Sequence, residues 1–100
     1  MKALVIDAFR AELPIRAERI DQAFQQANRT LLFELVHQLK GSAGIYGFDN
    51  ITETARPICD HLRVDDELEE LQATESELVA LCRQAASHQP GTPSDQQAHP

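Results

Sequence analysis

Apolar residues recur every three or four positions along most of this chain, which is the spacing of amphipathic α-helices. The clearest of these stripes lies between residues 30 and 45. Thr30 is suited to cap this helix, because a threonine hydroxyl can accept a hydrogen bond from a free N–H group of the first turn. The residues that would face the core are Leu32, Leu35, Val36, Leu39 and Ala43.

Two more stripes follow toward the C-terminus. Asp49 or Asn50 can cap the next helix, and Glu53, three residues after Asn50, would complete a capping box. Asp65 and Asp66 favour the start of a later helix, because acidic side chains stabilise the N-terminal end of the helix dipole. The apolar faces of the two helices would be Ile51, Ala55, Ile58 and Leu62 in the first, and Leu68, Leu71, Leu78, Cys82 and Ala85 in the second, where Glu75 interrupts the pattern.

The N-terminal part of the pattern contains a proline. Residues 3–12 have the spacing of a short helix, and Pro14 should end it because proline removes a helical hydrogen bond. Proline is well suited to the first turn of a helix, so a second helix is expected over about residues 14–27.

Amphipathic helices with short connections bury their apolar faces by packing together. The pattern therefore predicts an all-α fold, an antiparallel four-helix bundle preceded by a short N-terminal helix, over residues 1–87. Residues 88–100 contain three prolines and no periodic apolar positions, which is typical of a disordered C-terminal tail.

The charge of the chain limits the classes of molecule that it can bind. The net charge is −7, and residues 46–100 carry eleven acidic and three basic side chains. This distribution argues against nucleic acid, whose phosphates require a basic face. The sequence has neither an apolar run long enough for a membrane span nor the pattern of a signal peptide, so we expect a cytoplasmic protein with no membrane partner.

The two cysteines lack the spacing of a metal site. Cys59 and Cys82 lie at apolar helical positions and are expected to be buried free thiols. A metal-binding bundle would need ligands that converge in the core, for example His37 with His61. Because His37 is predicted outside the apolar stripe, we expect no metal site in this chain.

The polar residues of the helix over residues 30–45 include a histidine on the outer side. At 100° per residue the apolar stripe is centred on Leu32, while His37 lies about 140° and Gly41 about 180° away from it. Lys40 and Gly44 lie at the edge of the same outer flank, and Gly47 follows as the expected residue of positive φ at the C-terminal end of the helix. A glycine inside a helix costs about 1 kcal/mol relative to alanine, so Gly41 suggests that open space beside the histidine is useful.

Each of these features has an ordinary explanation when taken alone. A surface histidine and a solvated lysine are common, and Phe33, one turn before His37, could be covered by the N-terminal helix instead of docking another protein. Together they describe an accessible imidazole with a cleared side, a nearby cation and an apolar neighbour. Such an arrangement suits a nucleophile that accepts a phosphoryl group from another protein.

The stretch HQLKGSAGIYG resembles the signature of the histidine-containing phosphotransfer (HPt) family, and the resemblance extends over about residues 2–86. It implies a short helix leading into a four-helix bundle, with His37 as the phosphoacceptor through Nε2. It also implies that Lys40 stabilises the phosphoryl group and that Gly41 gives steric access. Ser42 lies about 280° from Leu32, toward the bundle, so we expect it to make a structural hydrogen bond and not a phosphate contact. Three residues would contact the partner, and four would belong to the structural part of the motif: Phe33, Gln38 and Gly44 in the first set, and Leu39, Ser42, Ala43 and Gly47 in the second.

The resemblance also implies the partners of the chain. They would be receiver domains of response regulators or of hybrid histidine kinases, which supply Mg²⁺ from their acidic pocket, while this chain is expected to be a monomer without a cofactor of its own. A phosphate-binding GxxxxGK[ST] motif is absent from the sequence. We therefore expect a phosphotransfer intermediate that is not an enzyme with autokinase activity.

Two related functions stay open at this point. The ending GIYGF also resembles the phosphoacceptor domains of chemotaxis-type histidine kinases, in which ATP is the donor through a separate kinase domain. A non-catalytic module that binds receiver domains without transfer is the other alternative. The combination of His37, Lys40 and Gly41 favours transfer, because a module without chemistry would not need it.

Overall fold

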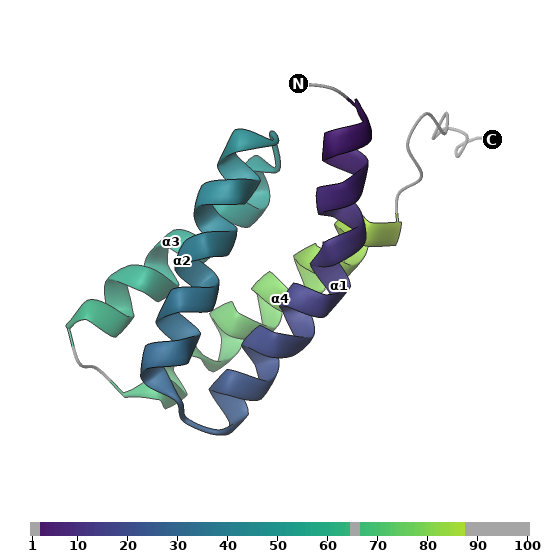
Figure 1. Ribbon diagram of the computed structural model, residues 1–100. Coiled ribbons are helices and arrows are strands. Elements are labelled where there is room, and N and C mark those ends of the chain that lie inside the picture. The colour runs from purple at the N-terminus through teal and green to yellow at the C-terminus, as the bar shows by residue number, and fades with distance from the viewer. Residues whose placement is uncertain (1–2, 65–66, 88–100) are drawn as a thin grey trace.

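The computed structural model describes residues 3–64 and 67–87, and this part of the chain is helical without any strand. The elements alternate in direction and form a bundle (Figure 1). The all-α class and the four-helix bundle predicted from the apolar pattern are therefore confirmed. The elements are α1 (Ala3–Gln25), α2 (Arg29–Ile45), α3 (Asp49–Arg63), the short 3₁₀ helix η1 (Leu68–Leu71) and α4 (Gln72–Ser87).

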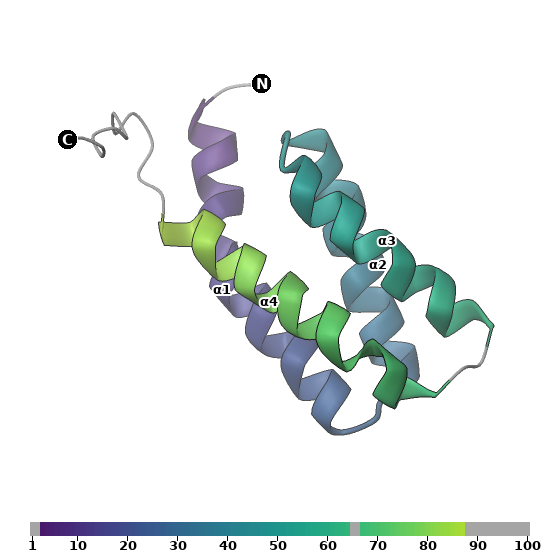
Figure 2. The ribbon, with the colours of Figure 1, turned by 180° about the vertical axis from the view of Figure 1, so that it is seen from behind.

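The helices pack in a closed ring. Each helix contacts the next along the chain, and α4 returns to lie beside α1, as both ribbon views show (Figure 1, Figure 2). Most buried residues of α2, α3 and α4 belong to the predicted stripes, but Cys59 and Val79 are buried outside them. Four predicted stripe residues are only partly buried: Leu35, Leu62, Leu68 and Ala85. The fully buried large side chains of the core include Leu13, Ile20, Leu32, Leu39, Ile51, Ile58 and Leu78.

The predicted break at Pro14 is wrong. Residues 3–25 form one helix with Pro14 inside it, so no separate short helix precedes the bundle. The ribbon of α1 changes direction along its length (Figure 1). An interior proline costs about 3 kcal/mol, and burying two large apolar side chains regains roughly 3–6 kcal/mol. Phe9 and Leu13, just before the proline, are both buried, so packing outweighs the local penalty.

Phe9 fixes the first part of α1 against the connection between α2 and α3. Its ring centroid lies 4.8 Å from that of Tyr46 and 5.5 Å from that of Phe48. Arg10, next to it, donates a hydrogen bond to the carbonyl oxygen of Ala85 at 3.1 Å and so ties the same turn to the end of α4. These contacts hold the helix in place on both sides of the bundle.

The caps of α2 and α3 differ from those that the sequence predicted. The cap of α2 is Asn28, whose side chain accepts a hydrogen bond from the N–H group of Leu31 at 3.2 Å, and Thr30 lies in the first turn. The residue before α3 is Phe48, without a side-chain cap, so the capping box with Glu53 is wrong. In both places the preceding helix ends in a tight turn that decides where the next helix begins.

Those two turns have the same hydrogen-bond pattern but different residues. At the end of α2, the N–H group of Phe48 bonds to the carbonyl of Ala43 at 2.8 Å, and Gly47 has φ +86°. This is a Schellman motif, and the predicted role of Gly47 as the turn residue is confirmed. At the end of α1, the N–H group of Asn28 bonds to the carbonyl of Ala23 at 3.0 Å, but the residue with positive φ is Ala27, at +56°.

Glu75 is the buried polar residue of the core in the described part of the chain, with only 1% of its surface exposed. Burial is the main reason that its pKa rises from 4.5 to about 7, and a side-chain hydrogen bond to Asp21 of α1 and the charge of that residue raise it further, against Arg83. Its Oε2 atom has no hydrogen-bond partner. The residue that interrupted the apolar stripe therefore faces the core as part of a carboxyl pair between α4 and α1.

The cysteine prediction is confirmed, because Cys59 and Cys82 are both buried and free. Burial raises the pKa of both thiols, that of Cys82 to about 11. None of the helices in residues 3–64 and 67–87 is long and apolar enough to cross a membrane. The predicted helix start at Asp65 and Asp66 and the predicted tail over residues 88–100 lie outside the described residues.

Candidate functional site

Helix α2 directs His37 to the surface. Leu32, Val36, Leu39 and Ala43 are fully buried on its inner side, and they fix the rotation of the helix in the bundle. His37 comes one residue after Val36 and is exposed. The outward position predicted from the helical spacing is therefore what the fold produces.

Gly41 lies one turn after His37 and leaves the helix surface bare. No heavy atom of a neighbouring group lies within 4 Å of the place where a Cβ atom would stand, and the φ angle is in the ordinary helical region. Neither packing nor backbone geometry therefore requires glycine here. The penalty of about 1 kcal/mol relative to alanine has no compensation inside the molecule.

Gly44, one turn further on, faces helix α3. A Cβ atom there would meet Oγ1 of Thr52 at 3.5 Å, which is an ordinary contact, so this position is less open than Gly41. The same Thr52 hydroxyl donates a hydrogen bond to the carbonyl oxygen of Lys40 at 3.1 Å. Thr52 thus joins α3 to α2 beside the site. Lys40 itself is half-buried.

The imidazole of His37 stacks on Phe33. The two ring centroids are 5.5 Å apart and the ring planes are 11° from parallel. The guanidinium carbon of Arg63, in the last turn of α3, lies 5.4 Å from the centroid of the Phe33 ring. The two ring contacts of Phe33 and the groove in which it lies thus come from α2 and α3.

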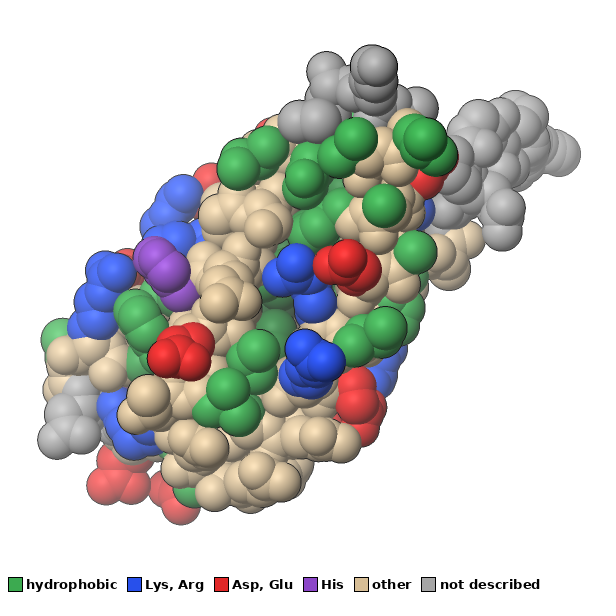
Figure 3. Space-filling view, viewed as in Figure 1, with side chains coloured by type: hydrophobic (Ala, Val, Ile, Leu, Met, Phe, Trp, Pro, Cys, Tyr) green, Lys and Arg blue, Asp and Glu red, His purple; other side chains and the backbone are tan. Residues whose placement is uncertain are grey.

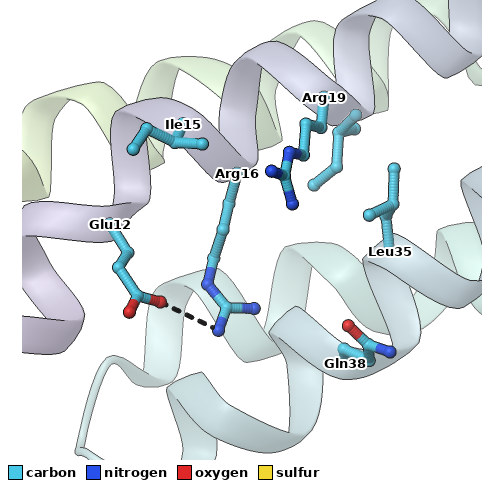
Figure 4. Close-up of a pocket in the computed structure, with 7 residues that line it drawn as sticks. Glu12, Ile15, Arg16, Arg19, Leu35 and Gln38 are labelled. Carbon is cyan, nitrogen blue, oxygen red and sulfur yellow. Dashed lines mark hydrogen bonds and ion pairs between the residues drawn. The ribbon is translucent and has the colours of Figure 1, made fainter.

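Two grooves follow helix α2, one on each side. The groove toward α3 has a volume of about 470 Å³, and Phe33 and Arg63 line it together with Arg29, Thr30, Glu34 and Leu62. The groove toward α1 has a volume of about 350 Å³, and Gln38 lies at its edge (Figure 4). On that side Arg16 is paired with Glu12 at 3.2 Å. The two predicted partner contacts Phe33 and Gln38 thus belong to opposite grooves.

The remaining motif residues have structural positions. Leu39 and Ala43 are buried in the core. Ser42 is half-buried and lines a small pocket together with Phe9 and Tyr46. Within residues 3–64 and 67–87 its hydroxyl has no hydrogen-bond partner, so the structural hydrogen bond expected from its direction is absent there.

Sequence reasoning missed Thr52 and Arg63 as neighbours of the site. Both are on α3, at helix positions that carry no motif and no apolar periodicity. The antiparallel pairing of α2 and α3 could have identified them. It places the start of α3, with Thr52, beside the end of α2, and the end of α3, with Arg63, beside the start of α2. The surface view shows Lys and Arg side chains next to an exposed histidine (Figure 3).

The geometry offers an exposed imidazole but no metal centre. Groups of three or more His, Cys, Asp or Glu residues that could hold a metal ion do not occur in the part of the chain that the structure describes. The chemistry available at His37 is that of a nitrogen nucleophile or base that a second molecule can reach.

One of the comparisons with known proteins agrees with the motif. A family model described as Hpt domain matches residues 5–89, which is most of the chain. No match was found among curated proteins or among solved structures. With its helical bundle and its exposed histidine on α2, the chain belongs to the Hpt domain family, whose members carry out histidine phosphotransfer in phosphorelay signalling.

Proposed function

We propose that this chain takes a phosphoryl group onto His37 from the aspartyl phosphate of a receiver domain and passes it to another receiver domain. The observation that carries this proposal is the outer face of α2, where an exposed imidazole lies one turn from a glycine that the fold itself does not require. A nucleophile that reacts with a group held by another protein must be reached by that protein. A bare helix surface beside the imidazole permits such an approach.

The chemical step is a displacement at phosphorus. The lone pair of Nε2 attacks, the bond between phosphorus and the aspartate oxygen breaks, and the carboxylate leaves with the electron pair. Because the transition state is loose, most of the catalysis is positioning and charge neutralisation. The Mg²⁺ ion would be held by the acidic pocket of the receiver domain, and this chain would add no cofactor and no autokinase activity.

Residues near His37 on α2 would share the remaining work. Lys40 would bring a positive charge to the phosphoryl oxygens, and Gly41 would let the receiver backbone come close. Phe33, Gln38 and Gly44 would contact the receiver on the two sides of the helix. Because one helix carries all of these groups, a monomer is sufficient for the reaction. We place this relay in the cytoplasm.

The distribution of charge supports an acidic partner at this face. The segment that comprises α2 and α3 contains equal numbers of basic and acidic side chains, so the net charge of −7 comes from the rest of the chain. A receiver with an acidic pocket is therefore repelled less at α2 and α3 than elsewhere. The four basic residues are Arg29, Lys40, Arg56 and Arg63, and the four acidic ones are Glu34, Asp49, Glu53 and Asp60.

The test is transfer from a panel of receiver domains that carry labelled aspartyl phosphate. We expect label on the wild-type chain that is stable in base and labile in acid, as for a phosphohistidine, and none on His37→Gln. His61→Gln is the matched control, since His61 is a second histidine in the described residues, on α3, and its Nε2 lies 3.0 Å from the carbonyl oxygen of Glu67.

Three results would contradict the proposal in different ways. Label on His37→Gln would show that the phosphoacceptor is another residue. Binding of receivers without any label would favour the non-catalytic module. Label that arrives only from ATP through a separate kinase domain would favour the chemotaxis-type alternative.

A further inference from the structure

The imidazole of His37 has an unusual environment for a nucleophile. In the described part of the chain it takes part in no hydrogen bond or ion pair, and its recorded side-chain contact is the stack on Phe33. A nucleophilic histidine is commonly held in orientation by a carboxylate or a carbonyl oxygen on its second ring nitrogen. Here a ring contact takes the place of that polar contact.

Phe33 is itself held by its surroundings. It is half-buried and packs against the hydrophobic core, and its ring lies in the groove whose other wall includes Leu62 of α3. An anchored ring of this kind limits the rotation of an exposed side chain that stacks on it. Parallel, offset aromatic rings at a centroid distance of 4.5–7 Å attract one another, and the present stack falls in that range.

Arg63 makes the connection to α3. Its guanidinium carbon lies 5.4 Å from the centroid of the Phe33 ring, close enough for a cation–π interaction. Arg63 also faces Asp60, with 3.8 Å between Nη1 and Oδ1. The Arg63 side chain is thus held by Asp60 of its own helix and by the Phe33 ring. Arg63 can therefore influence His37 through Phe33 without touching the imidazole.

We propose that Phe33 and Arg63 are positioning residues for His37, with Phe33 restricting the orientation of the imidazole before a phosphoryl donor arrives and Arg63 holding the Phe33 ring. This inference rests on the proposed function. It differs from a docking role for Phe33, because positioning acts in the free protein and affects every donor, whereas docking affects only a donor that is a protein.

A small phosphoryl donor separates the two roles. Phosphoramidate can transfer its phosphoryl group to Nε2: the new N–P bond forms, the P–N bond of the donor breaks and ammonia leaves. With the full chain, Phe33→Leu should be labelled about five-fold more slowly than wild type by phosphoramidate and by a receiver alike, because the leucine is apolar but cannot stack. Phe33→Tyr, which keeps the ring, should restore most of the rate.

Arg63 has a matched control on its own helix. Arg56 has the same charge and a similar exposed fraction, 51% against 54% for the side chain of Arg63, and like Arg63 it is paired with the acidic residue three positions earlier. The contact with the Phe33 ring belongs to Arg63. We expect Arg63→Gln to slow labelling by phosphoramidate about two- to three-fold and Arg56→Gln to leave it unchanged. Arg63→Lys should recover part of the loss, because it keeps a cation near the ring.

The stack can also be measured without any transfer. The ring current of Phe33 should move the NMR signals of the His37 ring protons upfield, and Phe33→Leu should remove that shift while the circular dichroism spectrum stays helical. Arg63→Gln should reduce the shift in part. If Phe33 contributed only to stability, the chemical shifts of the His37 ring protons and the labelling rate would not change together.

The outcomes are distinguishable. If neither donor labels the wild type, the proposed function fails and this inference fails with it. If the wild type is labelled and Phe33→Leu slows only the receiver reaction, Phe33 is a docking residue and the positioning role is overturned. Equal rates for wild type and Arg63→Gln, or equal losses for Arg63→Gln and Arg56→Gln, would overturn the role of Arg63.

Discussion

The helix pairs α2–α3 and α1–α4 treat polar chemistry in opposite ways. On α2 the imidazole of His37 lies at the surface, and the helix surface at Gly41 beside it is bare. Residues of α3 contact Lys40 and Phe33 next to it. Between α4 and α1, by contrast, the carboxyl group of Glu75 is buried and makes a hydrogen bond with the side chain of Asp21. The comparison shows that the exposed polar group and the buried one lie on different helix pairs of one small bundle. Removing polar groups from the outer face of α2 should mainly change transfer, and removing the carboxyl pair between α1 and α4 should mainly change unfolding.

The largest expected effect is a pH dependence of stability that Glu75 causes. The unfolded carboxyl ionises near pH 4.5, but the folded one keeps its proton up to about pH 7. Its contribution is complete below pH 4.5 and is lost as the pH rises through 7, which amounts to about 3 kcal/mol in the free energy of unfolding. Urea titrations at several pH values should show this fall for wild type and a much smaller one for Glu75→Gln.

The control for this prediction lies on the same helix. Glu77 is exposed, so Glu77→Gln should retain the pH dependence of the wild type. Labelling of His37 at a fixed pH should be the same in both variants. A fall of equal size in Glu75→Gln would show that the dependence has another origin, and a change in labelling would break the separation between the two helix pairs.

The next effect concerns the bare surface at Gly41. Gly41→Leu should leave the bundle folded and slow transfer from a receiver about ten-fold, because the side chain obstructs the approach that aligns the reacting atoms. Gly41→Ala should raise the free energy of unfolding by about 1 kcal/mol through helix propensity alone. Thermal unfolding and receiver labelling measure the two effects.

Gly44→Ala is the natural comparison for Gly41, since the added methyl group would only make an ordinary contact with Thr52. We expect it to slow transfer less than the same change at Gly41. Unchanged transfer in Gly41→Leu would refute the idea that this glycine serves access.

A smaller effect is expected at Lys40. Lys40→Gln removes the charge but leaves the carbonyl that accepts the Thr52 hydrogen bond, so stability should change little. Transfer should slow about five-fold, because a charge-assisted contact to the phosphoryl oxygens is lost. Rapid-quench labelling with a receiver measures this, and a rate equal to that of Arg56→Gln would argue against a role for Lys40.

The smallest prediction concerns the turn after α1. Ala27 has positive φ, which glycine adopts without strain, so Ala27→Gly should stabilise the fold by about 0.5 kcal/mol. Gly47→Ala, at the equivalent position after α2, should destabilise it. Chemical denaturation of both variants tests the pair, and a loss of stability in Ala27→Gly would contradict the assignment of strain to this turn.

Much of the bundle could be predicted because its signals are local. The stripes of α2 and α3 come from spacing alone, and the outward direction of His37 follows from the same spacing. The motif around His37 identified the family for the same reason, since its residues lie within one stretch of helix. Gly47 was recognisable because a glycine after an apolar stripe is the usual residue of a helix end.

Other features depend on contacts between distant residues. Pro14 was interpreted from its local cost, but the burial of Phe9 and Leu13 in the bundle decided the outcome. Glu75 looked like an interruption because its partner, Asp21, lies on another helix. The cation–π contact of Arg63 with Phe33 likewise joins residues thirty positions apart, and no periodicity within one helix could reveal it.

Pro14 has a consequence for the dynamics of α1. Since proline has no N–H group, the carbonyl of Arg10 lacks its usual partner, and the ladder of backbone hydrogen bonds has a gap at that turn. The segment before the gap, where Leu4 is 79% exposed, can therefore open without unwinding the residues that follow. In hydrogen exchange, amides before Pro14 should lose protection earlier than those after it. The helix is continuous in space, but we expect it to behave as two units in local unfolding.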